Sequence, residues 1–166
     1  MNKIGIIMGS DSDLPIAEKA IEKLAEYGIN YEVHVYSAHR TPEETIRFAK
    51  EARKNGFDAL IGIAGKAAHL AGVIAANTTL PVIGVPVNSS LEGMDALLST
   101  VQMPPGIPVA TVGIDGAANA AILAAEILAV SDEKLAQLLL KKRIEAKEAV
   151  LEKNHKIEEK WNGGTK

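Results

Sequence analysis

Five short runs of apolar, mostly β-branched residues recur along the chain with helical stretches between them, and this alternation limits the possible folds more than any other feature. Most runs are nearly continuous, which is typical of strands buried on both faces of a parallel sheet. The runs cover residues 4–8, 31–36, 59–64, 81–87 and 108–112. Because helices alternate with them, we predict an α/β fold with a three-layer, doubly wound, five-stranded parallel sheet.

The segments between the runs carry signals for helices. In the first segment, apolar residues recur at i, i+3, i+4 and i+7, and Gly28 follows as a stop signal. The next helix begins with Thr-Pro-Glu-Glu at residues 41–44, which predicts a capping box with proline at the first helical position, and Gly56 closes it. Further helices are expected at about residues 93–102 and 116–129.

A last helical stretch starts at Ser131, after the five strands. Its apolar positions include Leu135, Leu138, Leu139, Ile144, Ala149 and Val150. A helix added after a complete sheet must bury its apolar stripe against its own domain or against a neighbouring subunit, and we favour the subunit. We therefore expect a catalytic α/β domain over residues 1–130 and a C-terminal helix and tail over residues 131–166, packing on a neighbouring subunit.

Size and composition exclude several classes of function. The 166 residues suffice for one globular domain. Only 4% of them are aromatic and the net charge is −3, which disfavours nucleic-acid binding. The lack of cysteine excludes disulfides, thiolate nucleophiles and zinc–thiolate sites, and is compatible with a reducing cytoplasm. With neither a signal-peptide pattern nor a long apolar segment, we expect a cytoplasmic protein that does not bind membranes.

The first polar loop follows the first predicted strand, at the edge where ligands bind in such sheets. Its sequence, Gly-Ser-Asp-Ser-Asp at residues 9–13, offers a tight turn, two hydroxyl groups and the free N–H groups of a helix start, which together suit an anion. Simple N-capping of the helix by Ser12 or Asp13 explains the same pattern. A magnesium-dependent phosphotransferase is disfavoured, because no downstream acidic or lysine pattern supports it.

The second and third loops add groups that suit proton transfer and anion binding. Ser37, His39 and Arg40 follow the second strand, and His69 lies in the small-residue loop after the third. An ordinary histidine exchanges a proton near pH ~6.5, and arginine binds phosphate or carboxylate through two hydrogen bonds. Lone histidines at strand ends are more often structural, and no third ligand supports a metal site. The loops favour a small phosphorylated ligand and movement of a proton.

Six segments, in this order and spacing, resemble the PurE family of purine biosynthesis over about residues 4–128: GSDSD, SAHRTP, AAHL, PVIGVPV, LLSTVQMPPGIPVATV and GAANAAILAAEIL. The resemblance implies a flavodoxin-like sheet, a homo-octamer with sites shared between subunits, and a reaction that needs no metal, cofactor or ATP. In that reaction a carboxylate moves from the exocyclic nitrogen of the substrate to carbon 4 of its imidazole ring, by decarboxylation and recarboxylation. The product belongs to de novo purine biosynthesis.

The resemblance also assigns roles to residues of this chain. Phosphate and ribose contacts fall on Ser10, Asp13 and Arg40, and the general acid and base falls on His39. The remaining expected substrate contacts, around the migrating carboxylate, are Ser37, Gly65, Ala67, His69 and Leu70.

Two positions depart from the pattern of the mutase branch of this family. Lys66 stands where that branch usually has glycine, and Ala71 stands where it usually has proline. A basic residue at this place is similar to the carboxylase branch, which uses aminoimidazole ribonucleotide and free carbon dioxide. That branch typically has Ser-Asn where this chain has Ala67 and Ala68, so we favour the mutase and keep the carboxylase as an alternative.

A non-catalytic protein of the same fold that binds a nucleotide or a flavin is the other alternative. A flavin site needs flanking aromatic residues, for which Tyr36 and Trp161 are poor candidates. A yellow purified protein would revive that reading, and only turnover separates the enzyme from a catalytically dead descendant.

Overall fold

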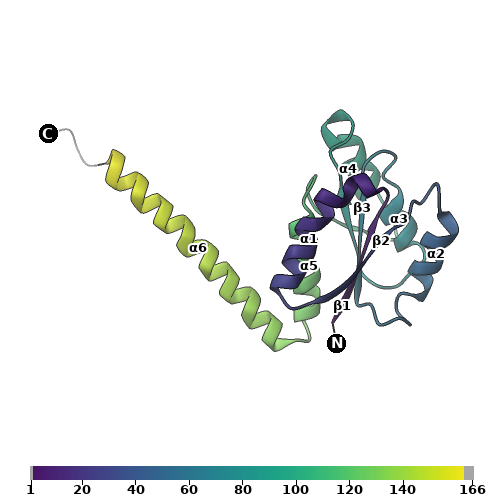
Figure 1. Ribbon diagram of the computed structural model, residues 1–166, viewed down its shortest axis with the longest axis horizontal. Coiled ribbons are helices and arrows are strands. Elements are labelled where there is room, and N and C mark those ends of the chain that lie inside the picture. The colour runs from purple at the N-terminus through teal and green to yellow at the C-terminus, as the bar shows by residue number, and fades with distance from the viewer. Residues whose placement is uncertain (1, 163–166) are drawn as a thin grey trace. The chain divides into compact units, whose positions relative to one another are not determined.

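The structure, a computed structural model, describes residues 2–162 and divides the chain into two units that meet between Leu128 and Ala129. The first unit contains a five-stranded sheet, drawn in Figure 1. Its strands are β1 (Lys3–Met8), β2 (Asn30–Val35), β3 (Ala59–Ala64), β4 (Val82–Pro86) and β5 (Ala110–Thr111). All neighbouring strands are parallel and their order is β2-β1-β3-β4-β5, so the predicted doubly wound, flavodoxin-like fold is confirmed.

Helices cover both faces of this sheet. Figure 1 shows α1 and α5 on one side of it and α2 and α3 on the other. The helices are η1 (Asp11–Asp13), α1 (Leu14–Glu26), α2 (Pro42–Glu51), α3 (Leu70–Ala75), η2 (Leu91–Gly93), α4 (Met94–Val101), α5 (Ala117–Ala129) and α6 (Glu133–Trp161). Short α3 has no counterpart among the helices predicted from sequence, because six residues are too few to display a helical period.

Two predicted helix caps are wrong. Neither Ser12 nor Asp13 caps a helix through its side chain; instead the Ser10 hydroxyl caps η1 by accepting from the Ser12 N–H at 3.3 Å. The capping box at Thr41 does not form either. The Thr41 hydroxyl accepts from the Ser37 N–H at 2.8 Å and donates to the Ser37 carbonyl at 3.2 Å. The hydroxyl thus closes the loop before α2 and is not available to the helix start.

The core lies along the central strands. Five of the six residues of β1 are buried, as are the first five of β3 and all of β4. In contrast, β2 occupies an edge, and its Tyr31 and Val35 are exposed. The expectation of burial on both faces therefore holds for the three inner strands and fails at this edge, where one neighbour is missing.

Small residues let α3 and α4 approach the sheet closely. A Cβ atom on Gly62 would lie 3.2 Å from the Ala71 Cα in α3, and one on Gly84 would lie 2.3 Å from the Thr100 Cγ2 in α4. Ala71 itself is buried. Ala71, which stands where the mutase branch usually has proline, therefore has a packing role. It is the second residue of α3, and in the first turn of a helix both proline and alanine are tolerated.

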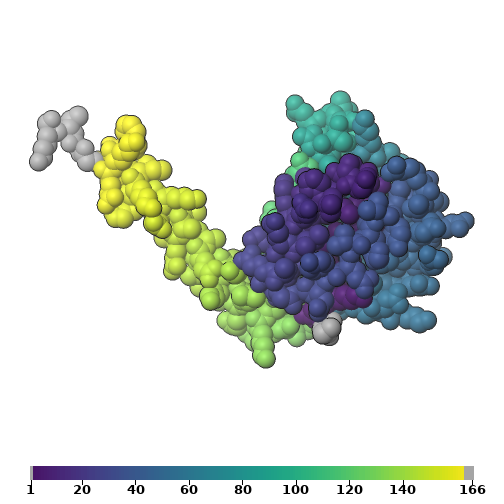
Figure 2. All heavy atoms as spheres, in the orientation of Figure 1, coloured from purple at the N-terminus to yellow at the C-terminus, as the bar shows by residue number. Residues whose placement is uncertain are grey.

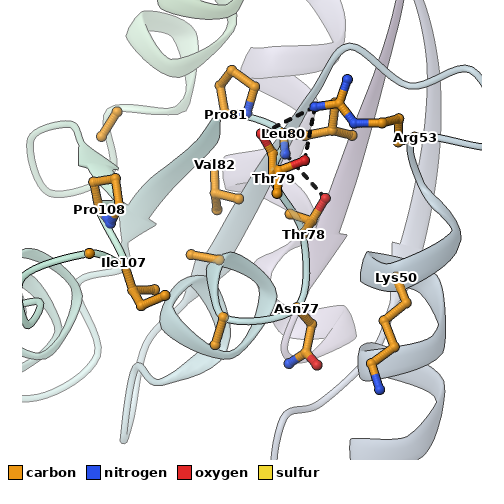
Figure 3. A pocket seen from close by; sticks show the side chains of 14 residues that line it. Lys50, Arg53, Asn77, Thr78, Thr79, Leu80, Pro81, Val82, Ile107 and Pro108 are labelled. Carbon is orange, nitrogen blue, oxygen red and sulfur yellow. Dashed lines mark hydrogen bonds between the residues drawn. The ribbon is translucent and has the colours of Figure 1, made fainter.

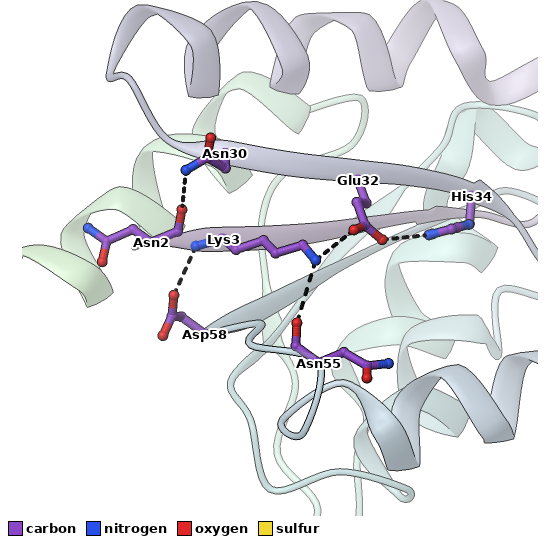
Figure 4. A network of polar contacts seen from close by, with 7 residues as sticks. All are labelled: Asn2, Lys3, Asn30, Glu32, His34, Asn55 and Asp58. Atoms are coloured by element: carbon purple, nitrogen blue, oxygen red, sulfur yellow. Dashed lines mark hydrogen bonds and ion pairs between the residues drawn. The ribbon is translucent and has the colours of Figure 1, made fainter.

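A polar network joins the amino-terminal ends of β1, β2 and β3, as Figure 4 shows. The Lys3 ammonium pairs with the Glu32 carboxylate at 2.6 Å, and the Lys3 N–H donates to the Asp58 carboxylate at 2.9 Å. The His34 ring lies 3.4 Å from Glu32. The hydrogen bond from Lys3, more than that from His34, holds the pKa of Glu32 below its ordinary value. The network fixes the end of the sheet that lies opposite the polar loops.

The second unit consists mainly of α6. Its N-cap is Asp132, whose carboxylate accepts from the Leu135 N–H at 3.1 Å, so the helix begins two residues later than predicted. Leu139 is buried, whereas Val150, Ile157 and Trp161 are exposed. These three follow Leu139 at i+11, i+18 and i+22, which places all four on one side of an α-helix. None of the helices in residues 2–162 has the length and apolar character of a membrane span.

A second exposed apolar stripe lies in the first unit, on η2 and α4. Leu91, Met94, Leu98 and Val101 recur at helical spacing, with exposures of 77, 51, 49 and 47% respectively. These elements form the teal projection of the first unit in the space-filling view (Figure 2). Leu91, Glu92 and Gly93 have left-handed φ values of 45°, 56° and 81°, so the backbone reverses sharply before α4.

Candidate active site

A cavity of about 360 Å³ lies at the carboxyl ends of the strands. Its walls come from the loops that follow β1, β2, β3 and β4, at the switch point where a flavodoxin-like sheet binds ligands. The lining residues are Gly9, Ser10, Ser12, Asp13, Ser37, Ala38, His39, Arg40, Ala64, Gly65, Lys66, Ala67, Leu70 and Ser89. All residues predicted for the site are among them except His69, which contacts His39. The structure thus brings these residues together, while their roles stay predictions.

The loop after β1 supplies hydroxyl groups and a buried carboxyl group. The Ser10 hydroxyl accepts from the Ser12 hydroxyl at 3.0 Å and lies 3.2 Å from the Asp11 carboxylate, to which it donates. Asp13 is only 8% exposed. Burial raises the pKa of Asp13, against the effect of a backbone hydrogen bond from Ser10, and the nearby charge of Asp11 adds to the rise. Hydroxyl donors on a ligand would relieve this desolvation.

The loop after β2 is held by one serine. The Ser37 hydroxyl accepts from the backbone N–H groups of His39 at 3.3 Å and Arg40 at 3.1 Å. The Arg40 guanidinium then reaches across to β1 and donates to the Gly9 carbonyl at 3.0 Å. Gly9 also donates its N–H to the Ile63 carbonyl of β3 at 3.0 Å. Hydrogen bonds therefore tie the ends of three neighbouring strands together around the cavity.

Two histidines from different loops meet at the cavity. His39 Nε2 and His69 Nδ1 lie 3.1 Å apart, with the two rings arranged edge to face. At this distance one nitrogen carries the hydrogen and the other accepts it. The contact orients His39 and gives it a neighbour with which a proton can be exchanged. Both histidines were expected at the same edge of the sheet. Their direct contact was not predicted, because they are 30 residues apart in the sequence.

The loop after β3 is shaped by close packing. A Cβ atom on Gly65 would lie 2.8 Å from the Ser89 hydroxyl, so glycine is needed for this approach. Ala67 has a left-handed φ of 44°, and its carbonyl accepts from the His69 N–H at 2.6 Å. Lys66 stands between them and lines the cavity.

Ser12, Ala38, Lys66 and Ser89 also line the cavity. Sequence analysis had noted Ser12 and Lys66 in these loops without assigning them a role in the site, and it had not singled out Ala38 or Ser89. Their common signal is position: each lies within four residues of the end of a strand, or in the first turn beyond it. That signal is weak, because most residues at this edge of the sheet share it.

A larger hollow of about 930 Å³ lies elsewhere on the first unit, around the residues that precede β4 and β5 (Figure 3). Two cationic side chains, Lys50 and Arg53, line it, but no acid or histidine does. The Arg53 guanidinium donates to the Thr79 carbonyl at 3.2 Å and to its hydroxyl at 3.1 Å. This hollow has no group suited to proton transfer, so the smaller cavity is the better candidate despite its size.

No three histidine or acidic side chains within residues 2–162 gather in a way that could hold a metal ion. The cavity lining itself offers one histidine, which is in contact with a second outside the lining, together with an arginine, a lysine and a buried carboxyl group.

Comparisons with known proteins agree with this geometry. The family described as AIR carboxylase matches residues 3–149. An N5-carboxyaminoimidazole ribonucleotide mutase of Methanocaldococcus jannaschii is 57% identical over 156 residues, which cover 94% of this chain and 98% of that protein. The enzyme of the same name from Bacillus subtilis is 52% identical, with coverage of 93% and 97%.

Solved structures and longer relatives add to the comparison. The crystal structure of Treponema denticola PurE superposes with a TM-score of 0.86 at 31% identity, covering 94% of this chain and 98% of the other. The phosphoribosylaminoimidazole carboxylase of Saccharomyces cerevisiae is 50% identical over 93% of this chain, but the match spans only 27% of that longer protein.

Proposed function

The chain belongs to the AIR carboxylase family, and from this premise we propose that it catalyses the N5-carboxyaminoimidazole ribonucleotide mutase reaction. In this reaction N5-carboxyaminoimidazole ribonucleotide becomes 4-carboxyaminoimidazole ribonucleotide, a step of purine biosynthesis. The observation that carries the proposal is the cavity lined by His39, Arg40 and Ser10, in which His39 is also in contact with His69. Its volume of about 360 Å³ lies in the range of small-molecule sites.

Ser10, Asp13 and Arg40 bind the phosphate and ribose of the substrate in this proposal. The guanidinium and the serine hydroxyl suit the phosphate, because both donate hydrogen bonds to oxyanions. The buried Asp13 carboxyl group suits the ribose, since two ribose hydroxyls can donate to a carboxylate that burial has deprived of water. The hydrogen bond from the Arg40 guanidinium to the Gly9 carbonyl holds this cation in place before the phosphate binds.

His39 acts as general acid and base. Cleavage of the bond between nitrogen and carboxylate leaves its electron pair on the exocyclic nitrogen, and His39 supplies the proton that this nitrogen takes up. Carbon 4 then attacks carbon dioxide to form the new carbon–carbon bond, and His39 removes the proton from carbon 4. The proton released in the second step restores the one given in the first. His69 positions His39 through the contact of 3.1 Å.

The remaining residues form the pocket that holds carbon dioxide between the two steps. Ser37, Gly65, Ala67 and Leu70 are small or apolar apart from one hydroxyl, which suits a neutral molecule. Holding carbon dioxide against the ring replaces an encounter from solution by an oriented step. Such orientation is worth up to about 7–11 kcal/mol in favourable intramolecular reactions.

A carboxylase that takes aminoimidazole ribonucleotide and free carbon dioxide is the second candidate. Its support is a similarity of position: Lys66 lines the cavity where the carboxylase branch also has a basic residue, and both reactions have the same carboxylated product. The relatives at 52–57% identity that carry the mutase name favour the first candidate.

A paired turnover assay tests the proposal. One sample receives fresh N5-carboxyaminoimidazole ribonucleotide without bicarbonate, and the other receives aminoimidazole ribonucleotide with high bicarbonate. The carbon-carboxylated product is followed by ultraviolet absorption. Efficient conversion in the first sample alone supports the mutase, a preference for the second identifies a carboxylase, and no turnover in either leaves a binding protein. A yellow preparation would point to the flavin-binding alternative.

We further propose that the enzyme acts in the cytoplasm as a homo-octamer in which α6 packs on a neighbouring subunit. The exposed residues Val150, Ile157 and Trp161, which continue the side of α6 that carries buried Leu139, support a partner for this helix. The exposed stripe of α4 supports a second contact between subunits, next to the loop that contributes Ser89 to the cavity.

A further inference from the structure

Lys66 carries a positive charge at the edge of the cavity. It is exposed and lines the cavity, and within residues 2–162 it forms no ion pair with an acidic side chain. Its place is fixed on both sides: Gly65 packs against Ser89, and the left-handed Ala67 carbonyl accepts from the His69 N–H. The ammonium group is therefore carried on an ordered loop, not on a free tail.

Two cations line the cavity at different strands of the sheet. Arg40 follows β2 and is held at the end of β1 by its hydrogen bond to the Gly9 carbonyl. Lys66 follows β3, on the side of Ser89, which comes after β4. Because the strand order is β2-β1-β3-β4, these two cations lie toward opposite sides of the switch point. The arrangement suits a ligand with two separate negative groups.

Lys66 also lies close to the histidine pair. His69 lies three positions after Lys66, so their Cα atoms are at most roughly 11 Å apart, since consecutive Cα atoms are about 3.8 Å apart. A lysine side chain can span much of that distance. The substrate proposed above has a phosphate at one end and, beside the atoms that exchange protons with His39, a carboxylate at the other.

We propose that the Lys66 ammonium binds the migrating carboxylate and makes the site selective for carboxylated nucleotides over aminoimidazole ribonucleotide. This inference rests on the proposed function and adds to it a residue that sets substrate selectivity. Ammonium and carboxylate attract each other in both the substrate and the product, where the carboxylate is charged. The carbon dioxide formed between them is neutral and gains nothing from Lys66.

The charge difference predicts how Lys66 affects the kinetics. The Lys66–carboxylate interaction stabilises the bound substrate but weakens as the carboxylate leaves. Such an interaction lowers KM without raising kcat. Lys66→Met should therefore raise KM for N5-carboxyaminoimidazole ribonucleotide on the order of tenfold, as expected for one charged hydrogen bond, and leave kcat undiminished. A catalytic residue would behave in the opposite way.

Binding measurements give a readout that does not depend on turnover. Calorimetric titrations use the full chain in a His39→Asn background, which stops conversion, with and without Lys66→Met. Each protein is titrated with 4-carboxyaminoimidazole ribonucleotide and with aminoimidazole ribonucleotide. Lys66→Arg keeps the charge, and Lys50→Met removes a lysine that lines the other hollow.

We expect Lys66→Met to weaken binding of the carboxylated nucleotide about tenfold and that of aminoimidazole ribonucleotide less than twofold. Lys66→Arg should restore most of the loss, and Lys50→Met should have no effect. Equal weakening for both nucleotides would overturn the inference, because Lys66 would then act on the shared phosphate. Unchanged affinity for both would overturn it as well. In either case the wild-type turnover still supports the proposed function, whereas a wild-type chain that neither binds nor converts these nucleotides defeats both.

Discussion

His39 is the residue on which the proposed chemistry depends most. We predict that His39→Asn lowers kcat by about 10²–10⁴, the usual contribution of a general acid or base, while the affinity for the nucleotide stays within a few-fold of wild type. The asparagine keeps a polar group near His69 but cannot exchange a proton at neutral pH. Single-turnover kinetics and calorimetry measure the two quantities separately.

His155→Asn is the matched control for this substitution. His155 lies on the exposed surface of α6, 3.5 Å from Glu159, so its loss should change neither quantity. If His39→Asn lost affinity and rate in equal measure, His39 would be a binding residue and the proton transfer would have to be assigned to another group.

Asp13 gives a prediction about stability and pH. Burial raises its pKa above the ordinary value of 3.8, so the native state holds the proton to higher pH than the unfolded chain does. The charged carboxylate therefore costs stability, and the cost grows as pH rises from about that value through the raised native pKa. We predict that the stability of Asp13→Asn relative to wild type is greater at pH 7 than at pH 3.5. The variant should also bind the nucleotide less well.

Thermal midpoints at one fixed protein concentration measure this difference, because assembly makes the midpoint depend on concentration. Glu22→Gln, at an exposed position of α1, should show no such gain. A difference between Asp13→Asn and wild type that is the same at both pH values would mean that the Asp13 charge is not desolvated in the native state.

At the residue scale, sequence could predict which side chains gather but not how they bond. The strand ends located Ser10, Ser37, His39 and Arg40 because carboxyl ends of parallel strands share one edge. Ser10 caps in place of Ser12, and Ser37 is the partner of the Thr41 hydroxyl. Both choices depend on the backbone conformation of the loops, which no sequence pattern encodes. The His39–His69 contact likewise depends on the loop geometry around Ala67.

At the scale of elements, the close approach of α4 to β4 gives the sharpest prediction. Gly84→Ala places a Cβ atom 2.3 Å from the Thr100 Cγ2 and 2.9 Å from the Val109 Cγ1, so α4 and the segment before β5 must move. We expect a loss of about 1–3 kcal/mol in the free energy of unfolding, the usual cost of overpacking a core. Urea denaturation at fixed protein concentration measures it.

Gly113→Ala serves as the comparison, because nothing lies within 4 Å of a Cβ atom built there. It should change stability by no more than about 0.5 kcal/mol. Equal losses for the two variants would indicate that the contact between α4 and β4 is looser than the structure has it.

The elements themselves differ in how far sequence could predict them. β1, β3 and β4 were located within one residue at each end, because burial on both faces leaves a continuous apolar run. Only Ala110–Thr111 of the run predicted at residues 108–112 pairs as β5, since proline at its start has no N–H for the ladder. Short α3 lacked a period that sequence analysis could detect.

At the scale of the whole molecule, the proposed assembly predicts a particle of eight times 17.6 kDa in light scattering. Val150→Glu combined with Ile157→Glu puts charge on the exposed apolar side of α6 and should reduce the mass of the particle. Charges at such a contact must be desolvated without a partner, which opposes association.

Lys141→Glu combined with His155→Glu adds the same side chains at exposed positions on the opposite side of α6 and should leave the mass unchanged. A wild-type particle of 17.6 kDa would contradict both the octamer and the expectation, made from sequence, that residues 131–166 pack on a neighbouring subunit.

The cavity lining begins at Gly9 and ends at Ser89, so among the described residues neither α5 nor α6 contributes to it. A further domain joined at either terminus would leave every one of these loops in its original order. The segment can therefore form one domain of a larger polypeptide. In the yeast relative the matching part is about a quarter of the protein. Fusion to a further domain therefore requires no change in the residues of this site.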